Sequence, residues 1–310
     1  MPVVWQISVL NTPESAFVQG VILTKAPIYN TNKKNIIYHF VTVLKSYFIR
    51  VYANKKITIK IGKKYYQTQT NIYGNFFLKI SNQKINNVLI LDSKKQSEFK
   101  IIQDYPVIFN EHPDSTGVIS DIDDTIIVSY TANTLKRIST LIFIPPLKRK
   151  IVEFSNKIIS LLKTQNINVY YVSKSENNLF LIISSIIKHN GLTEGILFLT
   201  PYLQFSELFR KKKGIDFKFT TIEFIIQNTN HKKFILLGDD TQKDMEVYRL
   251  ITEKYPDKIG KIFIRQTKKT LNTRKINYLN ALKKTCKNVV YFDKTTDIEK
   301  EMTHLNNIKK

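Results

Sequence analysis

The feature that most constrains the fold of this chain is a change of hydrophobic pattern near residue 116. Before it, apolar and polar residues alternate in short runs, as where Ile57, Ile59 and Ile61 are separated by Thr58 and Lys60. After it, strand-like apolar runs alternate with longer stretches of helical period. An alternation of period two is typical of half-buried strands, and the second pattern is typical of strands joined by amphipathic helices. We therefore expect a β-rich part followed by an α/β part.

The β-rich part covers about residues 16–109. Besides the run at 57–61, we expect strands at 38–44, 47–53, 64–70, 75–81 and 86–92. The tripeptide Tyr73-Gly74-Asn75 is typical of a hairpin turn, because glycine and asparagine tolerate positive φ. This pattern predicts a small all-β sandwich domain over residues 1–110.

In the α/β part, which we expect to span residues 111–310, six runs are predicted to be strands: 117–120, 167–172, 196–199, 234–237, 261–264 and 288–292. In the first helical stretch five apolar residues fall on one face: Ile151, Phe154, Ile158, Leu161 and Leu162. Strands that alternate with amphipathic helices predict a Rossmann-like parallel sheet with flanking helices. Ligands of such sheets bind beyond the carboxyl ends of the strands.

Composition restricts the compartment and the cofactors. With 310 residues and 43% hydrophobic content, the chain is long enough for two domains. A single cysteine, Cys286, fits a reducing compartment, and the five histidines have no zinc-ligand spacing. The start MPVVWQISVL does not resemble a secretory signal, and the apolar runs are shorter than the roughly 20 residues needed to span a bilayer. We expect a cytoplasmic protein without a transmembrane segment.

The net charge of +23 favours anionic partners. Most of it comes from scattered lysine doublets, so a solvated, lysine-rich surface is an equally good explanation. Only Lys148–Lys150 and Arg210–Lys213 are dense clusters, and no arginine-aromatic pattern accompanies them. We therefore expect no nucleic-acid partner. The expected partner is an anionic phospholipid or membrane surface, to which the protein would bind peripherally.

The nine residues VISDIDDTI at 118–126 carry the chemistry. Asp121 and Asp123 lie two apart directly after an apolar run, so in extended backbone both face one pocket. Two carboxylates so close repel each other unless a cation lies between them, and hard oxygen ligands favour Mg²⁺. Ser173 and Asp239 also follow predicted strands, and Gly238 allows close backbone approach to a metal or phosphate. These residues predict phosphoryl chemistry at one edge of the sheet.

The order D-x-D-x-T, Ser, Lys, G-D-x-x-x-x-D resembles the haloacid dehalogenase superfamily of aspartate-nucleophile phosphatases. Residues 117–267 are similar to the actin-patch-associated phosphatidate phosphatase domain, and the β-rich half is similar to the N-terminal region of bacterial members. The matching phrases are SDIDDT at 120–125, YVSKS at 171–175, KFILLGDDTQKDMEVY at 233–248 and IFIRQT at 262–267.

The resemblance implies a role for each matching residue. Asp121 is the expected nucleophile and Asp123 the general acid and base. Mg²⁺ is expected on the Asp121 carboxylate, the Asp123 carbonyl and Asp239. The residues expected to contact the phosphoryl group are Thr125, Ser173 and Lys218, and Asp244 is expected to orient Lys218 or metal-bound water. For Asp124 and Asp240, which the reaction does not need, we expect capping or supporting roles.

The substrate is less constrained than the reaction. Family members often carry Pro-Trp after the serine segment, where this chain has Glu176-Asn177. The gaps between motifs leave no room for a cap domain, and an open site suits a large or membrane-embedded monoester. The stretch 126–147 is either an apolar flap or packing at the sheet edge. We expect a Mg²⁺-dependent phosphatidate phosphatase that releases diacylglycerol and phosphate. The alternatives are a phosphatase for a phosphoprotein or phosphorylated glycan, and a lipid- or protein-binding module on a phosphatase-like scaffold.

Overall fold

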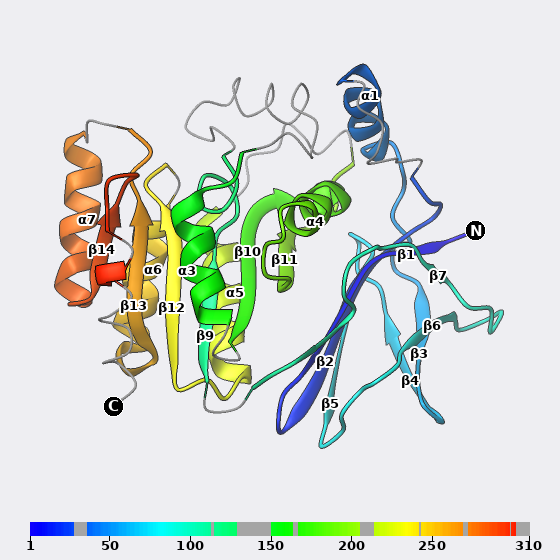
Figure 1. The fold of residues 1–310 in the computed structure, drawn as a ribbon. Coiled ribbons are helices and arrows are strands. Elements are labelled where there is room, and N and C mark those ends of the chain that lie inside the picture. Colours follow the sequence, from blue (N-terminus) through cyan, green and yellow to red (C-terminus); the bar gives the residue numbers. More distant parts are fainter. Residues whose placement is uncertain are drawn as a thin grey trace.

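The chain forms a β-rich part and an α/β part that lie side by side (Figure 1). The computed structural model describes residues 1–27, 36–112, 115–128, 150–163, 167–204, 214–241, 243–268, 272–297 and 299–301. The basic cluster 210–213, Lys148 and Arg149, and most of the stretch 126–147 lie outside these residues.

Two sheets make up the β-rich part. The first contains β1 (Val3–Asn11), β2 (Ser15–Leu23) and β5 (Asn75–Ser81) in antiparallel order, with the short strands β7 (Lys100–Ile101) and β8 (Ile108–Asn110) parallel to β1. The second contains β3 (Lys56–Ile61), β4 (Lys64–Gln69) and β6 (Leu89–Asp92), all antiparallel. Both sheets contribute to one apolar core, which includes Ile7, Val18, Ile59 and Ile90. The prediction of a β domain before the α/β part is confirmed.

The predicted strand at 38–44 is wrong, because these residues belong to helix α1 (Ile36–Ser46). Its β-branched residues favour a strand locally, and tertiary packing overrides this weak preference. Thr42 and Ser46, four residues apart, are buried, and the Tyr202 hydroxyl donates to the carbonyl of Ser46 at 2.5 Å. The predicted strand at 47–53 is also wrong, since only Val51 forms an isolated bridge, to Leu23.

Strand β1 was not expected, because its residues do not alternate between buried and exposed. All nine are buried. Val4 and Val9 face the core of the β-rich part, whereas Val3 and Trp5 join a second core with the α/β part. A strand covered on both faces has a nearly continuous apolar sequence, which hides the period of two.

The α/β part has the predicted parallel sheet of six strands, and their order is β11-β10-β9-β12-β13-β14. The strands are β9 (Thr116–Ser120), β10 (Asn168–Glu176), β11 (Ile196–Thr200), β12 (Lys233–Asp239), β13 (Ile259–Arg265) and β14 (Val289–Phe292). The helices are α3 (Glu153–Lys163), α4 (Phe180–His189), α5 (Gly214–Asn228), α6 (Asp244–Lys254) and α7 (Thr273–Thr285), with 3-10 turns η2 (Asn177–Leu179) and η4 (Pro256–Lys258).

Helices cover both faces of this sheet. Val118 points to the face where α3 and α4 pack, and its neighbour Ile119 points to the face where α5, α6 and α7 pack. In α3 the predicted apolar face is correct for Phe154 and Ile158, but Leu161 is 39% exposed. Ile151 precedes the helix, and the side chain of Leu162 lies outside the described residues.

The two parts are joined by an apolar core and by hydrogen bonds. The indole nitrogen of Trp5 donates to the carbonyl of Asn177 at 2.8 Å, and Gln6 Nε2 donates to the carbonyl of Leu197 at 2.8 Å. Across the same contact the Tyr105 hydroxyl donates to the carbonyl of Gly195. The boundary at residues 110 and 111 stays a prediction. No helix among the described residues is both long enough and apolar enough to cross a membrane.

Candidate functional site

Two central strands of the parallel sheet bring the predicted acids together. Asp121 follows β9 directly, and its backbone N–H donates to the carbonyl of Leu237 in the neighbouring strand β12 at 2.9 Å. Asp239 is the last residue of β12. Both side chains therefore lie at the carboxyl edge of the sheet, where parallel sheets bind ligands.

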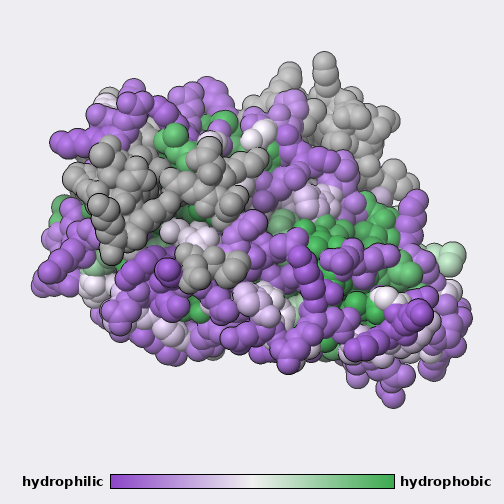
Figure 2. Space-filling model, turned by 60° about the horizontal axis from the view of Figure 1, so that its bottom comes forward, coloured by the Kyte–Doolittle hydropathy of each residue, from purple (hydrophilic) through white to green (hydrophobic). Residues whose placement is uncertain are grey.

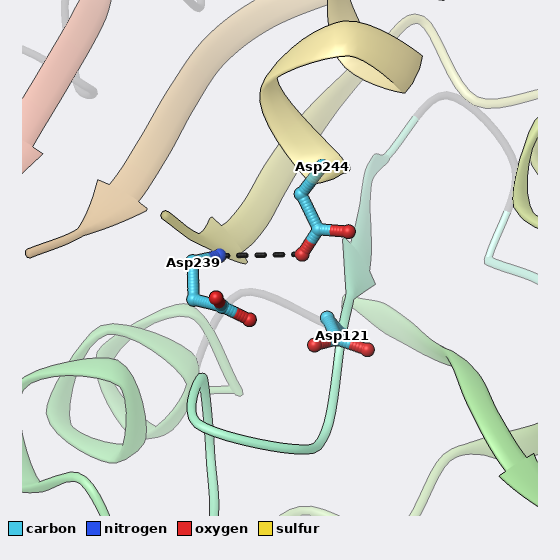
Figure 3. Close-up of side chains that lie close together, drawn as sticks. All are labelled: Asp121, Asp239 and Asp244. Carbon is cyan, nitrogen blue, oxygen red and sulfur yellow. Dashed lines mark hydrogen bonds between the residues drawn. The ribbon is translucent and has the colours of Figure 1, made fainter. Parts of the chain in front are cut away.

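Asp121, Asp239 and Asp244 form a buried acidic cluster (Figure 3). One carboxylate oxygen from each lies within 4.8 Å of the other two. The backbone N–H of Asp239 donates to Asp244 Oδ2 at 3.3 Å, and Asp244 begins α6. Gly238 is needed here, because a Cβ atom would lie 2.8 Å from the ring of Tyr248 and 2.9 Å from the Asp244 side chain.

Lys218 supplies the positive charge of this cluster from α5. Its Nζ lies 2.8 Å from Asp121 Oδ1 and 2.5 Å from Asp244 Oδ1, and its side chain is 1% exposed. Burial alone would lower the pKa of Lys218, but the two carboxylates raise it above its ordinary value, so the ammonium is charged. The predicted contact between Asp244 and Lys218 is present in the structure.

The cluster has more negative charge than Lys218 can neutralise. Burial raises the pKa of Asp121 well above its usual range, with a smaller opposite effect of Lys218. Burial and the neighbouring Asp244 raise the pKa of Asp239 to about 7. A divalent cation here would favour the ionised form of both carboxylates.

The donor set fits a small divalent cation. Asp121 Oδ2 is buried, and no hydrogen-bond donor among the described residues contacts it. Hard carboxylate oxygens converging within 4.8 Å are what a small divalent cation requires. Asp121 and Asp239 would hold the ion. The predicted contribution of the Asp123 carbonyl stays a prediction.

The Asp123 carboxylate is held by two hydroxyls from the end of β10. Ser173 Oγ donates to Asp123 Oδ2 at 3.2 Å, and Ser175 Oγ donates to the same oxygen at 2.5 Å. Ser173 Oγ also accepts from the N–H of Ser175 at 3.0 Å. Since a serine has a single hydroxyl proton, Ser173 could donate to a phosphoryl oxygen only by leaving Asp123. Its contact with phosphate stays a prediction.

The remaining predicted residues lie around this centre. Thr125 is fully buried, and its Oγ1 has no hydrogen-bond partner among the described residues. Asp124 has a positive φ of 60°, and its carbonyl accepts from Arg265 Nη1 at 2.6 Å. Asp240 is 2% exposed and supports the ends of neighbouring elements, as a partner of Thr267, Lys275 and Tyr291. The N-cap of the following helix α6 is Lys243 and not Asp240.

Three residues beside the site were missed. Ser175 and Arg265 lie in phrases that carried the resemblance, but no role had been given to them. Lys174 lies between the two serines, and burial lowers its pKa, with an additional effect of Lys218. Their positions depend on how β10 and β13 end, which a pattern of apolar residues does not specify.

Comparison with known proteins agrees with this geometry. Residues 116–266 match the family model "Phosphatidate phosphatase APP1, catalytic domain". The chain is 27% identical over 203 residues to "Phosphatidate phosphatase APP1" of Saccharomyces cerevisiae, covering 63% of this chain and 34% of the yeast protein. It is 24% identical over 237 residues to "Uncharacterized protein C29B5.04c" of Schizosaccharomyces pombe, covering 70% and 37% of the two chains. The matched part is thus about a third of the length of these relatives.

Solved structures give weaker likenesses. A putative HAD-like phosphatase of Mesorhizobium loti has a TM-score of 0.35 at 10% identity, covering 56% of this chain and 88% of that one. A putative beta-phosphoglucomutase of Thermotoga maritima has a TM-score of 0.37 at 10% identity, covering 62% and 99%. The family match, together with the buried acids at the ends of β9 and β12, confirms the resemblance seen in the sequence. Through residues 116–266, this chain is therefore similar to the family of APP1 phosphatidate phosphatase catalytic domains.

Proposed function

We propose that this chain is a Mg²⁺-dependent phosphomonoesterase that acts through an aspartyl phosphate on Asp121. The observation that carries the proposal is the burial of Asp121 beside Lys218 and within reach of Asp239 and Asp244. The ammonium of Lys218 opposes the protonation of Asp121 that burial favours, and a bound divalent cation would favour the ionised nucleophile further. A purely structural acid has no need of this arrangement, which argues against a non-catalytic scaffold.

The proposed reaction has two steps. An oxygen of Asp121 attacks phosphorus while the bond from phosphorus to the ester oxygen breaks, and Asp123 gives its proton to that leaving oxygen. Water then attacks the aspartyl phosphate, Asp123 takes back a proton, and inorganic phosphate leaves. Mg²⁺ would offset the negative charge that accumulates around the transferred group. Ser173 and Ser175 position Asp123 by donating to its Oδ2, and we assign proton transfer to Oδ1.

Phosphatidate is the substrate that we propose. Beside the site lies a cavity of about 440 Å³ whose walls are both apolar and basic. Val128, Ile151 and Phe292 are among its apolar residues. Its three cations, Arg265, Lys268 and Lys294, outnumber its two acids, Glu153 and Asp293. Such walls suit an anionic amphiphile, and the family's yeast member is named for this substrate. In this proposal the protein works peripherally at an anionic membrane surface. A phosphoprotein or phosphorylated glycan is the competing substrate class.

The test is phosphate release from phosphatidate vesicles, compared with a panel of soluble phosphomonoesters, with and without Mg²⁺ and over a range of salt concentrations. We expect release that requires Mg²⁺, is fastest on vesicles and weakens with salt, because surface attraction is screened. Asp121→Asn should abolish release and leave vesicle binding unchanged. Release from soluble monoesters alone would rule out phosphatidate, and no release from any monoester would refute the enzyme.

A further inference from the structure

A second cavity, of about 520 Å³, lies where the β-rich part meets the α/β part. Its walls come from β2, β5, β11 and α5, and it contains none of the acids of the site described above. Figure 2 shows a broad apolar area in its right half, with hydrophilic surface around it. This volume is within the range of small-molecule sites in proteins.

The lining of this cavity is unusual for so charged a chain. Five of its residues are phenylalanines: Phe76, Phe77, Phe198, Phe217 and Phe224. Six others carry side-chain amides: Gln6, Gln19, Gln69, Asn71, Asn75 and Asn177. None of its described residues is charged, although the chain has 48 lysines and arginines and 25 acids. A lining of this kind suits a neutral ligand better than a charged one.

Two buried amide oxygens in the wall lack a hydrogen-bond partner among the described residues, Asn177 Oδ1 and Asn75 Oδ1. Asn177 is 5% exposed. Its orientation is fixed by a chain of contacts, because Gln6 Nε2 donates to the carbonyl of Leu197 and Asn177 Nδ2 then donates to Gln6 Oε1. Turning the Asn177 amide would bring two oxygens together, so its Oδ1 stays an acceptor. Buried acceptors of this kind normally have a partner.

The occupant must therefore offer hydroxyl or amide hydrogens and also apolar faces. Water could donate to the two oxygens, but it would not cover the phenyl rings. Phe77, for example, is 47% exposed, so an apolar ligand face is also needed. A sugar ring has both properties, since its hydroxyls donate at the rim and its C–H faces stack on aromatic rings. We propose that this cavity binds a neutral saccharide, with Asn75 and Asn177 as acceptors and the phenylalanines as its stacking surface.

The test is saturation-transfer NMR of the full chain with a panel of neutral mono- and disaccharides, followed by titration of any that binds. We expect at least one to bind, with the strongest transfer to its ring C–H protons. Asn75→Ala removes an acceptor that has no hydrogen-bond partner among the described residues, and should weaken binding about 3- to 10-fold, as for one hydrogen bond. Asn87→Ala is the matched control, because Asn87 is exposed and lies outside the cavity, and it should change nothing.

Two further variants separate this cavity from the acidic site. Thr221→Trp places a bulky ring inside the cavity and should abolish binding, with folding checked by thermal unfolding. Asp121→Asn should leave binding unchanged. The proposal is overturned if no saccharide binds, if Thr221→Trp binds as the wild type does, or if Asp121→Asn loses binding. Occupation by an extended peptide in place of saccharides would overturn it as well.

Discussion

At the scale of single residues, the site depends on the balance of buried charge. Lys218 is the one cation that the described structure places in contact with Asp121 and Asp244. Removing one partner of a buried ion pair is costly, because the other charge stays buried without compensation. A bound divalent cation would stabilise the same carboxylates. The metal and Lys218 would therefore neutralise the same negative charges.

This balance predicts the stability of Lys218→Met. Without metal, the free energy of unfolding should fall by about 3–5 kcal/mol at neutral pH, as for other broken buried pairs. Mg²⁺ should restore part of that loss, because it binds the folded state and neutralises the same acids. Urea unfolding with and without MgCl₂ measures both effects. Lys188→Met is the control, because Lys188 pairs at the surface with Asp104. An equal loss at all Mg²⁺ concentrations would contradict the shared site.

At the scale of elements, the sequence predicted the parallel sheet and the strand ends that carry Asp121 and Asp239, but it ended the strand of Ser173 too early, because β10 runs on to Glu176. The pattern is clear there because each strand is a short apolar run that ends in polar residues. Helix α1 was not predicted, since its β-branched residues locally favour a strand and packing overrides them. Strand β1 was not predicted, since a strand buried on both faces does not alternate. The contacts of Ser175 depend on the irregular end of β10, where the register with β11 shifts between Ser173 and Glu176, and local pattern does not determine this irregularity.

The position of Ser175 near the end of β10 leads to a testable prediction. Ser175→Ala removes the hydroxyl that lies 2.5 Å from Asp123 Oδ2, so the acid and base should be poorly positioned. We expect the turnover number to fall about 10-fold while KM changes little, because the substrate-binding walls are untouched. Steady-state phosphate release measures this split. Ser184→Ala is the control, since Ser184 is a buried serine on α4 whose hydroxyl bonds its own helix. If both variants behaved alike, a positioning role for Ser175 would be refuted.

At the scale of the whole molecule, the sheet edge opposite the acidic site holds a second pair of buried titratable groups. Glu111 follows β8, the last strand of the β-rich part, and His231 precedes β12 of the α/β part. His231 Nε2 lies 4.0 Å from Glu111 Oε1 and 2.9 Å from the hydroxyl of Tyr170. Burial raises the pKa of Glu111 to about 7 and lowers the pKa of His231 to about 4, so both groups are neutral over much of the range between.

The two shifts act oppositely on stability. The contribution of Glu111 is present below its ordinary pKa of 4.5 and is lost as pH rises through about 7. The contribution of His231 is present above its ordinary pKa of 6.5 and is lost as pH falls through about 4. Between pH 4.5 and 6.5 the two slopes have opposite signs, so the wild-type stability should depend little on this pair.

Substituting either residue should remove its own effect on how stability changes with pH and leave the effect of the other residue. Relative to wild type, Glu111→Gln should gain stability as pH rises from 4.5 to 7, by at most about 1.4 kcal/mol per pH unit, the value for one proton. His231→Asn should lose stability relative to wild type as pH rises from 4 to 6.5. Urea unfolding between pH 4 and 7.5 measures both differences, and subtracting the wild type cancels groups common to all three proteins. If the unfolding free energy of the variants changed with pH as that of the wild type does, protonation of Glu111 and His231 would not be coupled to folding.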